Sequence, residues 1–294
     1  MQIWRLIDTG SNKGFYNMAV DEAIAIACRE GIVPPTLRFY TWAPPCVSIG
    51  YFQKVERVLN KGGLDRDNNM TMVRRITGGR AVFHGNDLSY SVVCDTENRL
   101  FPDNIKGAYY TIAEALARGL KYLGITTDHL NNIKHRTLNT RQRRTQARGT
   151  HAKDGTQARG TQAKHGTQAK ACGYFLPYQH STLCFATTLG HEISVNGRKL
   201  IGSAQRRWSK VFLQHGSILI TESSSGNGRT SISFSEIIGD EPDTKSIISA
   251  LSAGFSDTLG INLIAGGLTR YEIDLAERLM EERYSKDSWN VKYA

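Results

Sequence analysis

The chain has 294 residues, of which 40% are apolar and 22% are charged. This usage is ordinary for a globular protein, so it excludes a wholly disordered chain and allows one large domain or two smaller ones. No window approaches 18 uninterrupted apolar residues, and we expect neither a membrane-spanning helix nor a signal peptide. Five cysteines at irregular spacing do not form a disulfide framework and favour a reducing cytoplasm.

The net charge of +10 belongs to one segment of the chain. Residues 131–172 hold ten Lys and Arg against the single acid Asp154, a net charge of +9, so the rest carries about +1. Gly-Thr and Thr-Gln-Ala recur there, and apolar side chains are too few to offset the entropy of ordering. The segment therefore predicts a disordered basic insertion in a surface loop. A nucleic-acid-binding patch is the alternative, but no aromatic residue is interleaved for base stacking.

The first half of the chain predicts two helices and five strands. Apolar residues on one side predict a helix over residues 17–29. A second helix begins at Asp103 or Asn104, carries apolar residues at helical spacing, and ends at Gly124. Between these helices, five short runs are typical of strands, at residues 37–40, 47–51, 70–75, 81–84 and 88–93.

The second half predicts a hairpin, further strands and two helices. Asn196-Gly197 between runs at 191–195 and 199–204 is a strong signal for a two-residue turn. The elements expected after it are a strand at 211–220, a helix at 243–259 that stops at Gly260, a strand at 261–264, and a helix that begins at the capping box Thr269–Glu272. Because the strands cluster in the middle without strict alternation with helices, the pattern favours an α+β fold with a mixed or largely antiparallel sheet.

Two glycines between predicted strands form the first candidate site. Gly78 and Gly79 are flanked by three arginines in the run 74–84. Paired glycines let backbone N–H groups approach a ligand closely, and the arginines favour an anionic or strongly polar group. A tight hairpin with a solvated basic rim is the alternative. His84 ends this run, and like His215 it is either a pocket residue or a buried structural histidine.

A lysine and a cysteine are the other two candidates. Lys199 follows the Asn-Gly turn, where it can hold a substrate carbonyl as an electrophile or simply lie on the surface. Cys184 can act as a nucleophile near neutral pH, and a neighbouring cation would raise its thiolate fraction. A small buried hydrophobe is the alternative for this cysteine.

The remaining cysteines carry weaker signals. Cys28 lies in the apolar face of a predicted helix and Cys94 ends a strand, so both predict buried structural residues. Cys46 and Cys172 lie in loops and stay ambiguous. No pair has C-x-x-C spacing and the histidines are scattered, so the sequence predicts no metal site.

Taken together, these segments resemble a known enzyme family. The run 74–84 resembles the Arg-Arg-x-x-Gly-Gly motif of the biotin/lipoate protein ligase superfamily. More narrowly, the chain is similar to the bacterial octanoyl-carrier-protein:protein N-octanoyltransferases of the Gram-positive type. The resemblance covers the chain from end to end except the insertion. Its other matching segments are 4–10, 17–23, 38–42, 48–53, 197–205, 214–219 and 284–290.

The resemblance implies one catalytic domain, formed by residues 1–130 and 173–294. It implies a central mixed, largely antiparallel sheet flanked by helices, with an acyl chain bound in a tunnel. It puts the nucleophile at Cys184, ahead of the strand that begins near Glu192, and the carbonyl-holding lysine at Lys199. The substrate-binding residues that it implies are Arg75, Gly78, Gly79, His84, Gly202, Ser203 and Ala204.

The implied reaction moves an octanoyl group from an acyl carrier protein to Cys184, and then to a lysine of a lipoyl-domain protein such as glycine cleavage H protein. Exchange between two thioesters is nearly isoenergetic, so the reaction needs no ATP, metal or other cofactor. Lys199 would stabilise the oxyanion and the thiolate. Neither a nucleic acid nor a membrane is an expected partner.

Several alternatives stay open. An ATP-dependent lipoate–protein ligase needs no cysteine, so Cys184 favours the transferase. An octanoyl amidotransferase between lipoyl domains shares the fold and the cysteine nucleophile, and the sequence separates it poorly. A non-catalytic scaffold for lipoyl domains or carrier protein would not need Cys184 and Lys199. Nucleic-acid binding through residues 131–172 would depend steeply on salt and would vanish when they are deleted.

Overall fold

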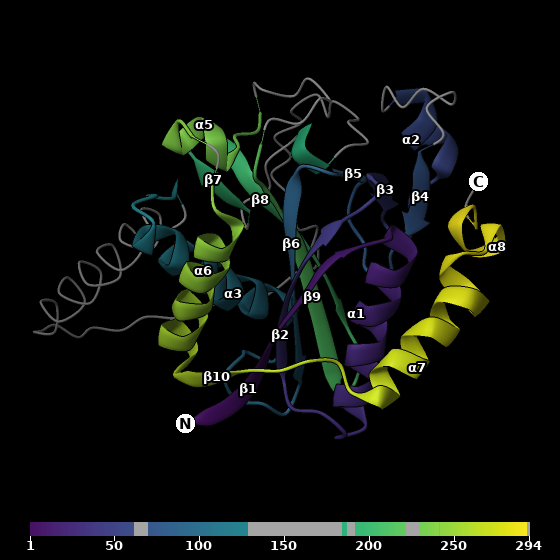
Figure 1. Cartoon of the computed structure of the whole chain (residues 1–294), viewed down its shortest axis with the longest axis horizontal. Coiled ribbons are helices and arrows are strands. Elements are labelled where there is room, and N and C mark those ends of the chain that lie inside the picture. Colours follow the sequence, from purple (N-terminus) through teal and green to yellow (C-terminus); the bar gives the residue numbers. More distant parts are fainter. Residues whose placement is uncertain (62–69, 129–183, 187–191, 222–229, 241, 293–294) are drawn as a thin grey trace, which may run out of the picture. The chain divides into compact units, whose positions relative to one another are not determined.

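The structure is a computed structural model, and it describes residues 1–61, 70–128, 184–186, 192–221, 230–240 and 242–292 (Figure 1). These residues belong to one compact unit formed by residues 1–131 and 181–294. The predicted insertion at 131–172, which includes Cys172, lies outside the described residues. Within the described part, no helix has both the length and the apolar character that crossing a bilayer requires.

A seven-stranded mixed sheet forms the centre of this unit. Its strand order is β10-β1-β2-β6-β9-β8-β7, where β1 pairs in parallel with β10 and β2 and all other pairs are antiparallel. The α+β fold with a largely antiparallel sheet is therefore confirmed. The strands are β1 Gln2–Asn12, β2 Thr36–Trp42, β6 Asp87–Asp95, β7 Ile193–Val195, β8 Arg198–Arg207, β9 Val211–Leu219 and β10 Ile261–Ala265.

A second, three-stranded sheet was not expected. It consists of β3 Cys46–Ile49, β4 Thr71–Arg74 and β5 Val82–His84, in the order β4-β3-β5. The predicted strands at 37–40 and 47–51 both exist, but the turn between them sends β2 into the large sheet and β3 into the small one. The small sheet carries the strands on both sides of the paired glycines.

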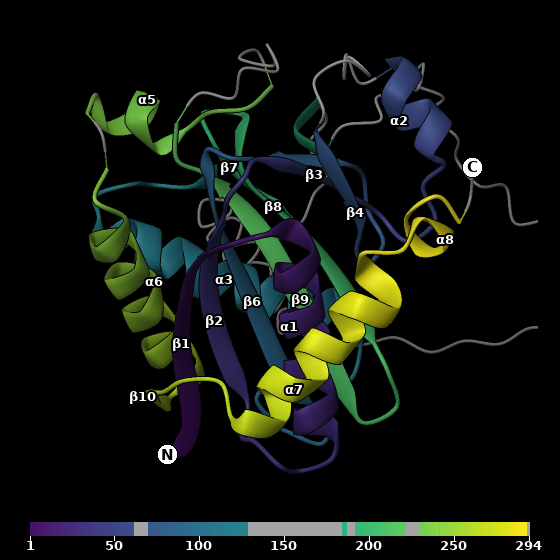
Figure 2. The ribbon, with the colours of Figure 1, turned by 45° about the vertical axis from the view of Figure 1, so that its right-hand side comes forward.

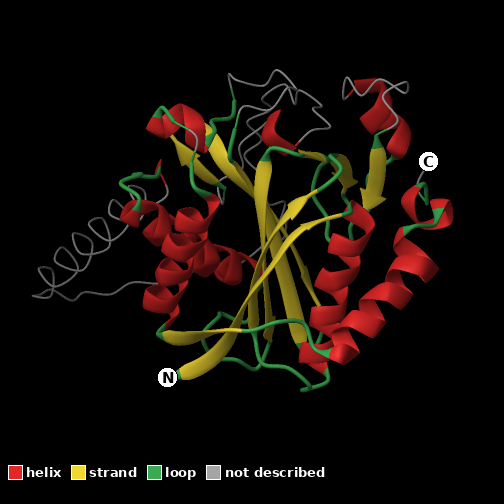
Figure 3. Cartoon of the chain, viewed as in Figure 1, coloured by secondary structure: helices red, strands yellow, loops and turns green. Residues whose placement is uncertain are grey.

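Helices pack on both faces of the large sheet (Figures 2 and 3). One apolar core joins one face of β2, β6 and β9 to α3 and α6, and a second core joins the opposite face to α1 and α7. The helices are α1 Gly14–Arg29, α2 Val55–Lys61, α3 Ile105–Tyr122, α5 Phe234–Ile238, α6 Thr244–Leu259, α7 Arg270–Leu279 and α8 Asp287–Asn290, with a short π-helical turn at Met280–Tyr284.

The local signals for helix ends and turns are confirmed. Asn104 caps α3 by accepting a hydrogen bond from the backbone of Gly107, and Gly260 ends α6 in the left-handed conformation. Thr269 and Glu272 form the predicted capping box of α7. Asn196 and Gly197 have φ values of 53° and 74°, as a type I′ hairpin turn between β7 and β8 requires.

Side chains alternate between the two faces of the large sheet, and this places a group of polar residues on one face. In β2, Leu37 and Phe39 join the core under α3 and α6, so Arg38, Tyr40 and Trp42 point to the opposite face. Strands β6 and β9 place serines and His215 on that same face. These are polar residues in fully buried strands, which is unusual unless they bind each other or a ligand.

Candidate active site

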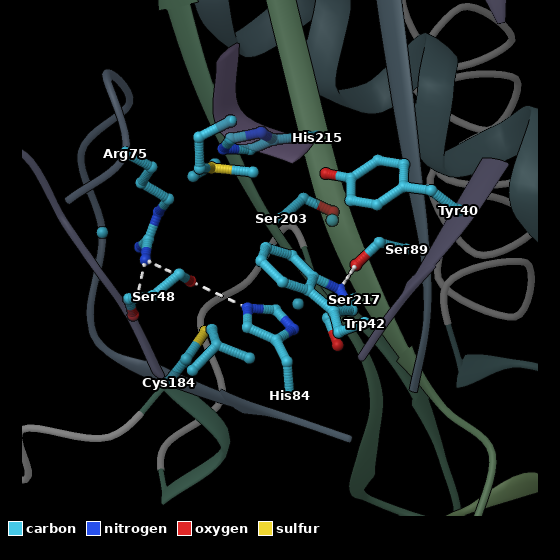
Figure 4. A pocket seen from close by; sticks show the side chains of 16 residues that line it. Tyr40, Trp42, Ser48, Arg75, His84, Ser89, Cys184, Ser203, His215 and Ser217 are labelled. Atoms are coloured by element: carbon cyan, nitrogen blue, oxygen red, sulfur yellow. Dashed lines mark hydrogen bonds between the residues drawn. The ribbon is translucent and has the colours of Figure 1, made fainter. Parts of the chain in front are cut away.

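A pocket lies between the large sheet and the small sheet (Figure 4). It contains about 390 Å³ of space, counted with its open mouth. Its wall comes from α1, from β2, β6, β8 and β9 of the large sheet, from β3 and β5 of the small sheet, and from the loop at residues 75–79. The lining residues labelled in Figure 4 are Tyr40, Trp42, Ser48, Arg75, His84, Ser89, Cys184, Ser203, His215 and Ser217.

Cys184 and Lys199 lie in direct contact at this pocket. Cys184 opens a single 3₁₀ turn, and its backbone N–H donates to the carbonyl of Ala81 at 2.8 Å, which ties the turn to the start of β5. Lys199 in β8 is fully buried, and its Nζ donates to the Cys184 carbonyl at 2.8 Å and to Cys184 Sγ at 3.2 Å. The same Nζ also donates to the Glu192 carboxylate. A cation therefore lies beside a partly exposed thiol at the pocket wall.

Gly202 makes room for this pair. A Cβ atom at this position would lie 2.9 Å from Lys199 Cε and 3.0 Å from Cys184 Sγ, which is closer than real Cβ contacts allow. A side chain at this position would press on the ends of both side chains, so glycine leaves them room to touch. Ser203 and Ala204, which follow it in β8, also line the pocket.

Arg75 holds the glycine loop in shape and lines the pocket. Its Nη2 donates to the carbonyls of Gly78 at 2.9 Å and Arg80 at 2.7 Å, and its Nη1 donates to the backbone and the hydroxyl of Ser48. Burial lowers the pKa of Arg75 to about 10, and negative charge at Cys184 opposes that shift. Gly79 has a φ of +91°, and a Cβ there would lie 2.9 Å from Arg75 Nη2, so the loop conformation requires glycine.

Arg74 has a different role from the one expected of the arginine cluster. It is fully buried and donates to the backbone carbonyls of Gly50, Tyr51, Gln53, Trp289 and Asn290. It does not line the pocket, because these carbonyls surround its guanidinium. Arg74 thus joins the small sheet to α8, and of the two adjacent arginines only Arg75 faces the site.

His84 is a pocket residue with two polar partners. Its Nε2 lies 2.8 Å from Ser48 Oγ and its Nδ1 lies 2.8 Å from Asp87 Oδ2. The ring stacks on Trp42 with centroids 3.8 Å apart. Burial opposes ionisation of Asp87, but the contacts with His84 and Ser217 hold the pKa of this carboxyl below its usual value.

In Figure 4, His215 lies at the top of the labelled residues, and His84 lies at the bottom. The Nδ1 of His215 lies 2.8 Å from Asp21 Oδ2 and its Nε2 lies 2.6 Å from Thr77 Oγ1, so both ring nitrogens are occupied. Burial lowers the pKa of His215, against the effect of Asp21. Asp21 in turn forms a buried ion pair with Arg38 and accepts a hydrogen bond from Tyr40. This network closes one end of the pocket.

Most of the predicted site residues meet at this pocket. Those that line it are Arg75, Gly79, His84, Cys184, Gly202, Ser203 and Ala204. Lys199 contacts Cys184 from within β8, and Gly78 contributes its carbonyl to Arg75 instead of lining the pocket. Ser48 and Asp87 were not predicted. The signal that could have pointed to Asp87 is an acid directly before the predicted strand at 88–93.

The other described cysteines are structural. Cys28, Cys46 and Cys94 are almost fully buried, which agrees with the expectation for Cys28 and Cys94 and settles the ambiguity of Cys46. Burial raises the pKa of Cys28 to about 12 and raises those of Cys46 and Cys94 still further. Across the described ranges, no three histidine, cysteine or acidic side chains gather as metal ligands would.

The sequence is similar to known proteins along nearly its whole length. Residues 13–246 match the family model of the lipoyl protein ligase A/B catalytic domain. The chain is 36% identical to an octanoyltransferase LipM of Symbiobacterium thermophilum, over 98% of both chains. It is 33% identical to an octanoyltransferase LipM of Clostridioides difficile, over 99% of this chain and 100% of that one, and 30% identical to one of Bacillus subtilis, over 99% of each.

Solved structures share the fold. The chain superposes on lipoate-protein ligase A bound with ATP with a TM-score of 0.68 at 22% identity, over 100% of both chains. It superposes on a putative lipoate protein ligase from T. acidophilum with a TM-score of 0.68 at 23% identity, over 99% of both chains. At these identities the likeness shows the fold alone, whereas the sequence relatives narrow the family. The chain belongs to the lipoyl protein ligase A/B catalytic-domain family and, within it, to the LipM-type octanoyltransferases.

Proposed function

We propose that the chain transfers an octanoyl group from an acyl carrier protein to a lysine of a lipoyl-domain protein, in two steps through a thioester on Cys184. The contact between Lys199 Nζ and Cys184 Sγ, 3.2 Å apart at the pocket wall, is the observation that carries this proposal. A thiol beside a buried ammonium is the arrangement that an activated cysteine nucleophile needs. The relatives named octanoyltransferases supply the acyl group that the proposal names.

In the first step, the Cys184 thiolate attacks the octanoyl thioester carried by the pantetheine arm of the donor. A new C–S bond forms to Sγ, and the pantetheine sulfur leaves with the electron pair of the old bond and takes up a proton. The ammonium of Lys199 lies 3.2 Å from Sγ, where it stabilises the negative charge on sulfur. The residues proposed to bind the acyl group are Arg75, Gly78, Gly79, His84, Gly202, Ser203 and Ala204.

In the second step, the ε-amine of the acceptor lysine attacks the acyl-enzyme. The C–N bond of an amide forms, Cys184 leaves as a thiolate beside Lys199, and the amine nitrogen gives up one proton to a base. No ATP enters either step because the donor thioester is already activated. The proposed reaction uses no metal or cofactor.

Intact mass spectrometry tests this proposal directly. The full chain is incubated with octanoyl-carrier protein in the absence of ATP. We expect a gain of one octanoyl group that hydroxylamine removes and that Cys184→Ala abolishes. Absence of the adduct with an active donor would refute the role of Cys184, and labelling that needs ATP and free acid would indicate a ligase.

The choice of donor distinguishes the transferase from an amidotransferase. The same assay is run with an octanoylated lipoyl domain in place of the carrier protein. We expect faster formation of the Cys184 adduct with octanoyl-carrier protein. A preference for the octanoylated lipoyl domain would assign the chain to amidotransferases, which share the nucleophile and the fold.

A further inference from the structure

The proposed second step needs a group that accepts a proton, and Lys199 is badly placed to be that group. An ammonium has three N–H donors and no lone pair. Lys199 Nζ uses its donors on the Cys184 carbonyl, Cys184 Sγ and the Glu192 carboxylate. Lys199 therefore stabilises the departing thiolate, while the nitrogen of the attacking amine must lose its proton elsewhere.

His215 is not available for this task. Asp21 and Thr77 occupy its two ring nitrogens at 2.8 and 2.6 Å. The imidazole is fixed between α1 and the glycine loop. Its hydroxyl partner Thr77 does not line the pocket, whereas Ser48, the hydroxyl partner of His84, does.

The hydrogen bonds around Ser48 have a defined direction. Arg75 Nη1 lies 3.1 Å from Ser48 Oγ, and an arginine can only donate, so the hydroxyl oxygen accepts from it. The Asp87 carboxylate, 2.8 Å from His84 Nδ1, can only accept, so the ring proton of neutral His84 lies on Nδ1. Nε2 then accepts the hydroxyl hydrogen of Ser48, 2.8 Å away.

The hydrogen bonds around Asp87 favour its ionised form, which can stabilise a protonated His84. Besides His84, its Oδ2 accepts hydrogen bonds from Ser217 at 2.6 Å and Ser89 at 3.2 Å, and its Oδ1 accepts one from the Gly85 backbone at 3.2 Å. Trp42 stacks on the imidazole and fixes its plane. Two of these residues, Ser48 and His84, line the same pocket as Cys184.

We propose that Ser48, His84 and Asp87 form a proton relay that serves the second step of the proposed transfer. As the C–N bond forms and the C–S bond breaks, the amine nitrogen gives its proton to Ser48 Oγ while the Ser48 proton moves to His84 Nε2. Asp87 stabilises the resulting imidazolium, and Cys184 keeps the electron pair of the broken bond as a thiolate. His84 then returns its proton to solvent. Ser48 touches the substrate, while His84 and Asp87 act through it as positioning residues.

This inference rests on the proposed function, and separate measurement of the two steps tests it. Single-turnover acylation of Cys184 by octanoyl-carrier protein is followed by mass, and the purified acyl-enzyme is then mixed with a lipoyl domain. For Ser48→Ala, we expect acylation within about threefold of the unmodified chain and aminolysis slower by about 10²-fold, the low end of general-base effects. Ser252→Ala, a buried serine of α6 outside the pocket, should leave both rates unchanged.

Hydroxylamine provides a readout that a merely structural role of Ser48 would not produce. The adduct that hydroxylamine forms with the acyl-enzyme is acidic enough to lose its N–H proton to water. The acyl-enzyme of Ser48→Ala should therefore react with hydroxylamine as fast as that of the unmodified chain. His84→Gln should slow lysine aminolysis more than it slows the reaction with hydroxylamine. Equal slowing of both steps, or lysine aminolysis at the unmodified rate, would overturn the relay. Failure of the unmodified chain to form an acyl-enzyme would instead refute the proposed function.

Discussion

Gly202 leaves the space in which Lys199 and Cys184 touch. Gly202→Ala would put a Cβ 2.9 Å from Lys199 Cε and 3.0 Å from Cys184 Sγ, so we expect the two side chains to shift apart. We expect thioester formation to fall by about 10²-fold, since loss of one electrostatic donor typically has that effect. Alkylation of Cys184 by iodoacetamide should slow as well, because the thiolate loses its cation.

Gly267→Ala is the matched control for this substitution. A Cβ at Gly267 would meet no atom within 4 Å, so the added methyl should change neither rate. Both rates are measured on the same preparations by mass. Unchanged alkylation and acylation in Gly202→Ala would show that the cation beside Sγ does not activate the cysteine.

We expect Met18 to limit the length of the acyl chain in the proposed reaction. It is 3% exposed, lines the pocket, and lies one turn before Asp21 on α1, beside the His215 network. His215 and Cys184 lie at opposite ends of the labelled group in Figure 4. An acyl chain attached to Cys184 would therefore extend toward Met18.

Met18→Ala should shift the acyl preference to longer chains. Removal of the side chain lengthens the pocket, so we expect the ratio of decanoyl to octanoyl transfer to rise several-fold. Met18→Leu keeps the side-chain volume and should keep the octanoyl preference. Competition between octanoyl- and decanoyl-carrier protein, read by mass, measures the ratio. An unchanged ratio in Met18→Ala would place the end of the acyl site elsewhere.

At the scale of elements, close packing of α3 against α6 depends on glycine. A Cβ at Gly254 would lie 2.4 Å from the Ala115 carbonyl oxygen and 2.4 Å from the Gly119 nitrogen, both backbone atoms. Gly254→Ala must therefore separate the two helices. Overpacking of this kind costs about 1–3 kcal/mol, which outweighs the better helix propensity of alanine.

Thermal unfolding measures this effect. Gly254→Ala should lower the Tm by several degrees, whereas Ser249→Ala on the exposed face of the same helix should leave it nearly unchanged. A Tm for Gly254→Ala at or above that of the unmodified chain would mean that the helices separate without cost.

The elements also show what sequence could and could not predict. Both ends of α3 and α6, the start of α7 and the β7–β8 turn were predicted because caps and turns are local chemistry. Strand β1 was missed because its buried residues Trp4 and Ile7 are three apart and its register shifts between Asp8 and Ser11. The small sheet was missed because the pairing of β3 with β4 joins segments more than 20 residues apart.

In the site, too, the individual groups were predictable from the sequence but their long-range contacts were not. The glycine run, Cys184 and Lys199 were found through motifs that the resemblance carries. The contact of Ser48 with His84 spans 36 residues and depends on how β3 pairs with β5, so no spacing in the sequence reveals it. Sequence predicted the chemical groups of the site, and only the fold showed their partners.

At the scale of the whole molecule, one ion pair joins the N-terminal strand to the C-terminal helices. Arg5 in β1 binds Glu272 of α7 through two hydrogen bonds of 2.6 and 2.8 Å, and the Glu272 side chain is fully buried. Burial opposes ionisation of this carboxyl, but Arg5 and the capping backbone of Thr269 hold the pKa of Glu272 below its usual value. The ionised carboxylate therefore stabilises the fold.

This stabilisation should be lost in acid. Because the folded pKa of Glu272 is depressed, its contribution is complete above the unfolded pKa of about 4.3 and disappears as the pH falls through the folded value. Glu272→Gln should cost about 2 kcal/mol at pH 7, the size of a charge-assisted hydrogen bond, and the gap to the unmodified chain should narrow below about pH 4.3 as the pH falls toward the folded pKa. Glu277→Gln, an exposed position on the same helix, should leave the Tm unchanged across that range. Thermal unfolding between pH 3 and pH 7 tests this, and a gap of constant size would mean that Glu272 acts through packing and not through its charge.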